Sequence, residues 1–146
     1  MRLYCDVCTI CRPLDDQTQP RIAAESLVFA QILKRIEDGS IQLISSDTLE
    51  TEVGNNPDQT RRQHSEDILF RAFDFADTTD DVKRIAEQFQ KYGIKPMDSF
   101  HLASAMKAEA DYFVTCDDQL SRKAKLLNTG SMIVMSLLEF LQELTQ

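Results

Sequence analysis

The sequence predicts an α/β domain built on a mostly parallel sheet, and two observations support this fold class. Short apolar runs typical of buried strands alternate along the chain with longer segments whose apolar residues recur at helical spacing. No internal repeat, low-complexity stretch or linker interrupts this order, so residues 1–146 are expected to form one domain. Because strands that alternate with helices are joined by crossovers, the sheet should be mostly parallel with helices on both faces.

Composition narrows the class of protein. Of the 146 residues, 42% are hydrophobic and 27% are charged, which is usual for one globular domain. No window holds about 18 consecutive apolar residues, and the N-terminus has no signal-peptide pattern, so we expect a cytoplasmic protein that does not span a membrane. The net charge is −8. Binding of nucleic acid would therefore need a cation or local basic patches to supply the attraction.

The chain opens with a strand, a loop and a helix. The apolar run 3–5 predicts a short buried strand that ends at Asp6. A polar loop bounded by two prolines follows at 12–20. Apolar residues at helical spacing then predict a helix over 20–38, which Gly39 ends.

A second strand is predicted at 41–44. The polar residues 45–47 that follow it are good helix caps, so a short helix should begin there and carry Glu50 and Glu52. The Gly-Asn-Asn-Pro segment at 54–57 ends that helix.

Three helices are then predicted in succession. Asp58 caps the first, which is expected to run to about Ala76. Its inward side chains should be Ile68, Leu69, Phe70 and Phe73. The second helix begins within 78–81 and is closed by Gly93. The third begins at Pro96, which suits the first turn of a helix because no partner is needed there for the missing N–H.

The last part of the chain repeats the alternation. A third strand is predicted at 112–115 and a short basic helix at 121–127. A fourth strand is predicted at 132–135, and the Ser-Leu-Leu-Glu segment at 136–139 is a capping box that opens the last helix.

Acidic residues occur where the predicted strands end. Those that share this position are Asp6, Glu50, Glu52, Asp117 and Asp118. Asp98 lies near the start of a buried helix, where nothing local requires it beyond capping. Ligands of open parallel sheets bind outside the carboxyl ends of the strands. We therefore expect these acids to lie together.

A group of converging carboxylates would need compensation. At ~6 Å and an effective dielectric constant of ~20, each pair of like charges costs roughly 3 kcal/mol. A protein can respond by raising a pKa or by binding a hard cation. Carboxylate oxygens suit Mg²⁺ or Mn²⁺, which can activate a water to attack a phosphodiester and neutralise the charge that develops.

At these residues the sequence resembles the PIN-domain family, the fold of the VapC-type toxin ribonucleases. The resemblance rests on four motifs: the apolar strand that ends in Asp6, a Glu on the helix after the second strand, the run Met97-Asp98-Ser99-Phe100-His101-Leu102-Ala103-Ser104-Ala105, and the run Phe113-Val114-Thr115-Cys116-Asp117. It covers nearly the whole chain in element order. It implies a three-layer α/β/α sandwich around a mostly parallel sheet of four to five strands.

The resemblance also implies a set of catalytic metal ligands. Asp6, Asp98 and Asp117 take three of the places. The fourth falls to Glu50 or Glu52, and we prefer Glu52 because an aliphatic residue follows it, as it usually does in the family.

Residues around these acids have expected supporting roles. Asp118 either joins the metal site or caps the following helix. Thr9 and Thr115 are expected to support the ligands, and Arg12 is expected to approach a substrate phosphate. Many family members have Asn or Ser two residues after the first Asp, where this chain has Cys8.

The function implied by the resemblance is hydrolysis of RNA phosphodiester bonds by an endoribonuclease that uses Mg²⁺ or Mn²⁺. Members of the family are often homodimers, and many are toxins paired with an antitoxin protein that blocks the active site. The alternative is a PIN-like module that binds RNA or protein without cleaving it. The net charge of −8 and the presence of Cys8 favour that alternative.

Overall fold

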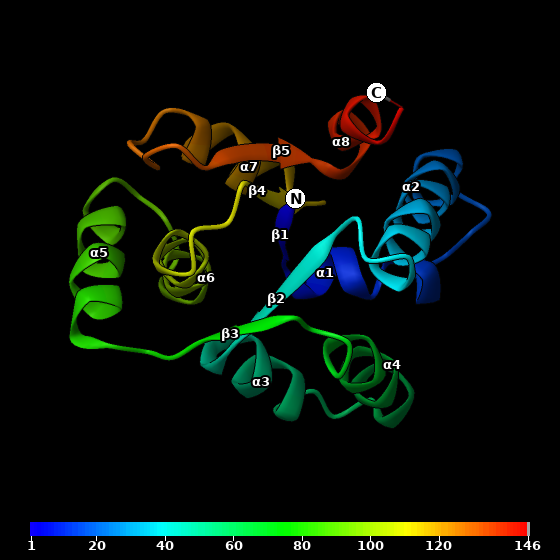
Figure 1. Cartoon of the computed structure of the whole chain (residues 1–146), viewed down its shortest axis with the longest axis horizontal. Coiled ribbons are helices and arrows are strands. Elements are labelled where there is room, and N and C mark those ends of the chain that lie inside the picture. Colours follow the sequence, from blue (N-terminus) through cyan, green and yellow to red (C-terminus); the bar gives the residue numbers. More distant parts are fainter. Residues whose placement is uncertain (146) are drawn as a thin grey trace.

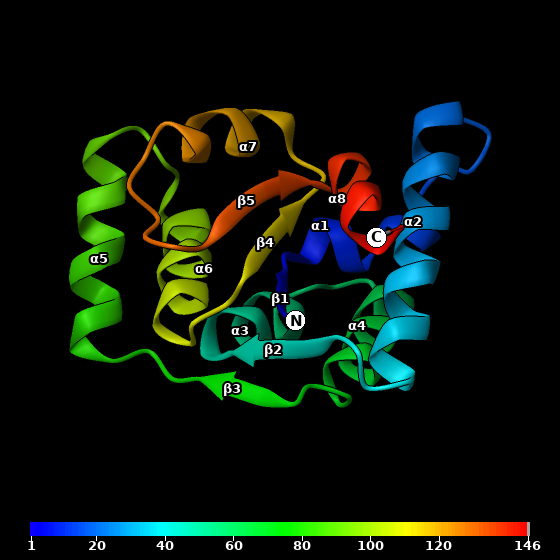
Figure 2. The same cartoon turned by 45° about the horizontal axis from the view of Figure 1, so that its top comes forward.

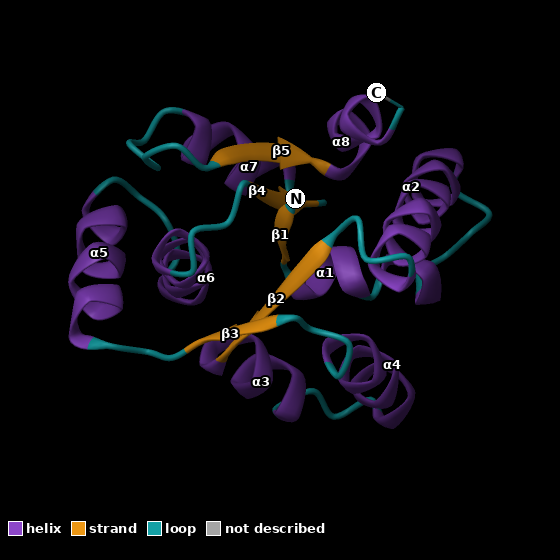
Figure 3. Cartoon of the chain, in the orientation of Figure 1, coloured by secondary structure: helices purple, strands orange, loops and turns teal. Residues whose placement is uncertain are grey.

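Five parallel strands form the centre of the protein. The computed structural model describes residues 1–145 and contains β1 (Arg2–Cys5), β2 (Gln42–Ser46), β3 (Asp74–Ala76), β4 (Tyr112–Thr115) and β5 (Ile133–Ser136). Their order across the sheet is β3-β2-β1-β4-β5, and every neighbouring pair is parallel (Figure 3). The predicted fold class is confirmed, with the sheet parallel throughout.

Helices cover both faces of this sheet. They are α1 (Val7–Ile10), α2 (Pro20–Glu37), α3 (Asp47–Gly54), α4 (Gln59–Leu69), α5 (Asp80–Lys91), α6 (Pro96–Lys107), α7 (Asp118–Lys125) and α8 (Leu137–Leu144), with a 3-10 turn at Arg12–Leu14. Helices α5 and α6 lie on one side of the sheet, and α2 and α8 pack together on the other (Figures 1 and 2). No helix within residues 1–145 is both long enough and apolar enough to cross a bilayer.

Local sequence signals explain where the helices begin and end. Pro20 and Pro96 each occupy the first turn of a helix, as predicted. The side chain of Ser46 accepts the backbone N–H of Leu49 and so caps α3. The capping box predicted at 136–139 is present at the start of α8.

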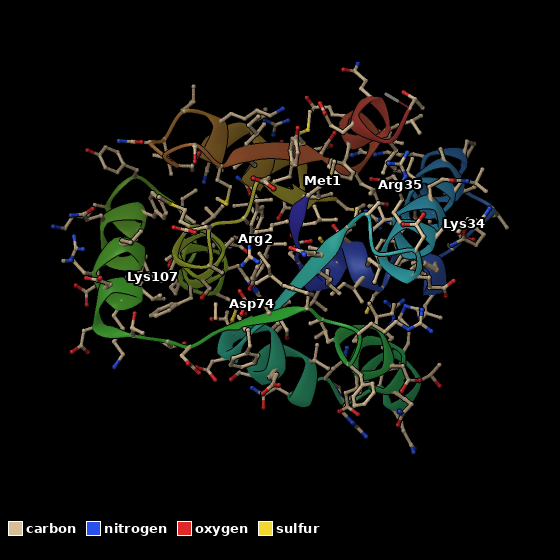
Figure 4. All side chains as sticks on the ribbon, viewed as in Figure 1. Met1, Arg2, Lys34, Arg35, Asp74 and Lys107 are labelled. Carbon is tan, nitrogen blue, oxygen red and sulfur yellow. The ribbon has the colours of Figure 1, made fainter. Side chains whose placement is uncertain are left out.

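The core is centred on β1, which has a neighbouring strand on each side. Leu3, Tyr4 and Cys5 are fully buried, and the ring of Tyr4 stacks on that of Phe113 in β4. At the amino end of the sheet, Arg2 reaches across to Asp74 of β3 with 2.6 Å between Nη2 and Oδ2 (Figure 4). The carboxyl ends of the strands lie at the opposite edge, which leaves that edge for the acids.

One predicted helix was wrong at its C-terminal end. The helix that Asp58 caps ends at Leu69 instead of Ala76, and β3 follows as an edge strand. The backbone N–H of Phe73 already donates to the carbonyl of Leu43 (2.8 Å), which brings the chain alongside β2. Phe70 and Phe73, predicted to point inward, are 90% and 67% exposed.

The loop predicted at 12–20 also has more structure than expected. The chain turns through α1 directly after β1 and then through the 3-10 turn before α2 begins. Helix α1 is only four residues long and starts at the cap formed by Asp6. This tight turn positions Asp6 and Thr9 together.

Candidate metal centre

Asp6 is a buried carboxylate with hydrogen bonds to both of its oxygens. Oδ1 accepts from the N–H and the hydroxyl of Thr9 (3.2 and 2.8 Å) and from Sγ of Cys8 (3.1 Å). Oδ2 accepts from the hydroxyl of Thr115 at 2.5 Å. The residue is only 5% exposed. These hydrogen bonds fix the orientation of the carboxylate.

Asp117 lies at the end of β4, next to the strand that ends at Asp6. Its Oδ1 accepts the backbone N–H groups of Gln119 and Leu120 (2.9 and 3.1 Å), so it caps α7. Its own N–H donates to the hydroxyl of Thr115 (3.0 Å). Thr115 therefore links the two acids, since the same hydroxyl donates to Asp6.

Asp98 occupies the first turn of α6 and is half-buried. Its pKa is raised above the ordinary value, first by burial and then by the negative charge of Asp6; Asp117 and Glu52 raise it further, and His101 opposes them. These effects place Asp6, Asp117 and Glu52 within electrostatic reach of Asp98. The structure thus brings Asp6, Glu52, Asp98 and Asp117 together at the carboxyl end of the sheet.

The two glutamates of α3 have different surroundings. Oε1 of Glu52 lies 2.6 Å from Nε2 of His101, which is on the same helix as Asp98. The charge of Glu52 is one of those that raise the pKa of Asp98. Glu50 is exposed and lines a separate cavity with Val53, Glu66, Leu69 and Phe70. Only Glu52 is therefore placed with the other acids.

Asp118 and Arg12 are engaged outside this group. Asp118 is exposed and forms a two-armed ion pair with Arg21 (2.6 and 2.7 Å), which holds its pKa below the usual value. The cap of α7 is Asp117, so the prediction that Asp118 caps this helix was wrong. Arg12 is paired with Asp15 (2.9 Å) and with the buried Glu25 (3.3 Å).

Two lysines lie beside the acids, and one of them belongs to the helix predicted to be basic. Lys95 and Lys123 line a small cavity together with Asp98 and Asp117. Nζ of Lys123 donates to the carbonyl of Gly93 (3.1 Å), which holds it at the rim. The only sequence signal was that Lys123 lies in a basic helix next to Asp117.

The donor chemistry of the group fits a hard divalent cation, because all four acids offer carboxylate oxygens. As placed, however, the side chains of residues 1–145 include no set of three or more His, Cys, Asp or Glu that could hold a metal ion. Three of the four carboxylates already have hydrogen-bonding partners within the chain. Asp6 is held by two threonines, Asp117 by the start of α7, and Glu52 by His101.

The fold and the site define a parallel α/β protein with four acids at the carboxyl end of its sheet. We call the group Asp6, Glu52, Asp98 and Asp117 the acidic pocket. The chain belongs to the PIN-domain family, whose model matches residues 16–126. Asp6 precedes the matched range, and the other three acids fall within it. PIN domains are generally nucleases, and they typically use divalent metal ions.

Solved structures share this fold. One is VapBC2 from Rickettsia felis, in a structure bound to a DNA fragment from its promoter: the identity is 13%, the TM-score is 0.59, and the match covers 93% of this chain and 98% of that chain. Another is PAE2754 from Pyrobaculum aerophilum, with 16% identity, a TM-score of 0.58, and coverage of 99% and 98%. A search of curated proteins finds no match to this chain.

Proposed function

We propose that the protein is an endoribonuclease that depends on Mg²⁺ or Mn²⁺ and hydrolyses RNA phosphodiester bonds. The observation that carries this proposal is the gathering of acids at the strand ends: the hydroxyl of Thr115 bridges Asp6 and Asp117, and Asp117 lines a small cavity with Asp98. Mutual repulsion within such a group is relieved when a divalent cation binds. Membership of a family of nucleases supports the proposal.

Each acid has a role in this proposal. Asp6, Glu52, Asp98 and Asp117 would hold the ion, which when bound supplies a more acidic water and neutralises developing charge. Thr9 and Thr115 keep Asp6 aimed at the pocket.

The lysines at the rim would bind the substrate. Lys95 and Lys123 carry positive charge beside Asp98 and Asp117, where an RNA phosphate would otherwise meet only negative charge. This local patch is the kind that a protein of net charge −8 needs.

The direct test is the variant Asp6→Asn, assayed for RNA cleavage with Mg²⁺, with Mn²⁺ and with a chelator. Cleavage should be lost in the variant and in the chelated wild type, while circular dichroism shows the fold unchanged. Asp38→Asn is the matched control, because Asp38 accepts from the backbone N–H of Ser40 at the far end of α2. Cleavage by Asp6→Asn at the wild-type rate would contradict the proposal.

The alternative is a PIN-like module that binds RNA or protein without cleaving it. The observation that favours it is that no metal-holding set of side chains is present within residues 1–145 as placed. Titration of the wild-type protein with Mn²⁺ in a calorimeter separates the two functions. Heat of binding with a stoichiometry of one or two ions supports the nuclease, and no binding supports the module.

We also propose that the protein works in an assembly, as a homodimer and as the toxin partner of an antitoxin protein in the cytoplasm. An exposed aromatic surface formed by Phe70, Phe73 and Phe75 at the β3 edge supports a protein partner. The fold similarity to VapBC2 supports the same proposal. Light scattering after size exclusion measures the mass of the purified protein. Twice the chain mass supports the homodimer, and a monomer contradicts it.

A further inference from the structure

A row of hydrogen-bonded side chains leads from the start of α3 to Glu52. Ser46 Oγ accepts the backbone N–H of Leu49 at 3.0 Å. Oη of Tyr4 lies 2.7 Å from Ser46 Oγ and 2.7 Å from Nδ1 of His101. Nε2 of His101 lies 2.6 Å from Oε1 of Glu52. Ser46 and Tyr4 are fully buried and His101 is 1% exposed, so water does not compete for the contacts among these three residues. The side chain of Glu52 is 38% exposed, so only this end of the row is open to water.

Chemistry fixes the direction of the hydrogen bond that ends the row. The Glu52 carboxylate can only accept, so Nε2 of His101 donates to it. Nδ1 of His101 meets the hydroxyl of Tyr4, which can donate or accept, and that hydroxyl also meets Ser46, which accepts the N–H of Leu49. The row therefore ends on a donor aimed at the carboxylate.

The row joins three elements that also supply the acids. Tyr4 lies on β1, two residues before Asp6, which follows the strand. Ser46 caps α3, the helix that carries Glu52. His101 lies one turn after Asp98 on α6. The same helix therefore provides one acid and the donor that holds another.

We propose that His101 is a positioning residue, which Tyr4 and Ser46 orient so that it holds the carboxylate of Glu52 at the acidic pocket. This inference rests on the proposed metal-dependent function. A glutamate has several rotatable bonds, and ordering such a side chain costs conformational entropy. A donor on a rigid buried helix supplies that order before a cation or a substrate arrives.

The test measures the affinity of the protein for Mn²⁺ by calorimetry, without RNA. His101→Leu removes the donor and should weaken Mn²⁺ binding about 10- to 100-fold. His101→Gln should restore part of the affinity, because its amide nitrogen can donate as Nε2 does. Tyr4→Phe keeps the ring on Phe113 and removes only the hydroxyl, so it should cause a smaller loss. If His101→Leu does not fold, the comparison of Tyr4→Phe with wild type decides the matter.

A double-mutant cycle distinguishes positioning from general support of the fold. His101→Leu should cause no further loss of Mn²⁺ affinity in a Glu52→Gln background, since the group that it positions is already altered. An equal loss in both backgrounds would overturn the inference. Leu102→Ala is the matched control, because Leu102 is fully buried on the same helix. It should lower the unfolding midpoint and leave the Mn²⁺ affinity within about twofold of wild type.

The outcomes also separate this inference from the proposed function. A wild-type protein that binds no Mn²⁺ overturns both. A wild-type protein that binds Mn²⁺, with His101→Leu and Tyr4→Phe binding it equally well, overturns the positioning role alone.

Discussion

The acidic pocket and the aromatic surface differ in the contacts that their side chains make with the rest of the chain. In the pocket, Asp6 is a buried carboxylate whose two oxygens both accept hydrogen bonds from the chain. On the aromatic surface, Phe70 and Phe73 are large, apolar and open to solvent. The comparison teaches that the geometry of the pocket is determined by contacts within the chain, whereas the described residues leave these aromatic rings uncovered.

The largest expected effect tests whether the pocket is specific to one glutamate. Glu52→Gln should reduce RNA cleavage more than about 100-fold, since the loss of a ligand should exceed the effect of losing a surrounding contact. Glu50→Gln should stay within about twofold of wild type, because Glu50 lines a different cavity. Initial rates at saturating Mg²⁺ check both variants. Equal losses of cleavage in the two variants would contradict the placement of Glu52, and not Glu50, in the acidic pocket.

A second change tests how strongly the pocket contributes to stability. Thr115→Val keeps the side-chain volume and removes the hydroxyl that joins Asp6 to Asp117. It should lower the free energy of unfolding by about 2–3 kcal/mol, the usual cost of losing a hydrogen bond to a charged group. The control Thr129→Val loses a bond to a neutral carbonyl and should cost about 1 kcal/mol. Urea unfolding without metal measures both.

The raised pKa of Asp98 predicts a smaller effect with a definite sign. A carboxyl whose pKa is higher in the folded state than in the unfolded state loses stability as pH rises through the interval between them. Asp98→Asn should therefore be more stable than wild type at pH 7 without metal, and the difference should vanish below about pH 4. We expect less than about 1 kcal/mol, because the side chain is half-exposed and water screens its charge. Thermal melts across pH would contradict this if wild type were the more stable protein at pH 7.

The smallest expected effect on the fold lies on the aromatic surface. Phe70→Ser should change the free energy of unfolding by no more than about 0.5 kcal/mol, because Phe70 is 90% exposed. The matched buried change Phe29→Ala should cost about 3–5 kcal/mol. A loss of dimer mass in Phe70→Ser without loss of stability would identify the aromatic surface as the dimer contact. A large loss of stability would show that Phe70 is packed in solution.

The parts of the fold predicted from the sequence were those with strong local signals. Prolines at helix starts and the capping box at 136–139 act through the adjacent backbone, so a single segment reveals them. Strand β3 was missed because it has three residues, of which only Ala76 is buried. Three residues are too few to show the alternation of apolar and polar side chains that marks a strand. The helical spacing of the nearby apolar residues therefore predicted a helix with Phe70 and Phe73 pointing inward.

The acids at the strand ends could be predicted because parallel strands end at one edge of the sheet. The contact between Glu52 and His101 could not, since it depends on how α3 and α6 sit against each other. For the same reason the ion pair of Arg12 with the buried Glu25 could not be predicted, and the approach of Arg12 to a substrate phosphate stays a prediction. The metal ligands themselves stay a prediction.

The bond between Thr115 and Asp6 joins residues 109 positions apart. A ribosome that has made only the first hundred residues has released Asp6 but not the strand that secures it. This contact is therefore absent from the growing polypeptide until β4 has been made. Asp6 would thus have to wait for β4 to emerge before the hydroxyl that fixes one of its oxygens can reach it.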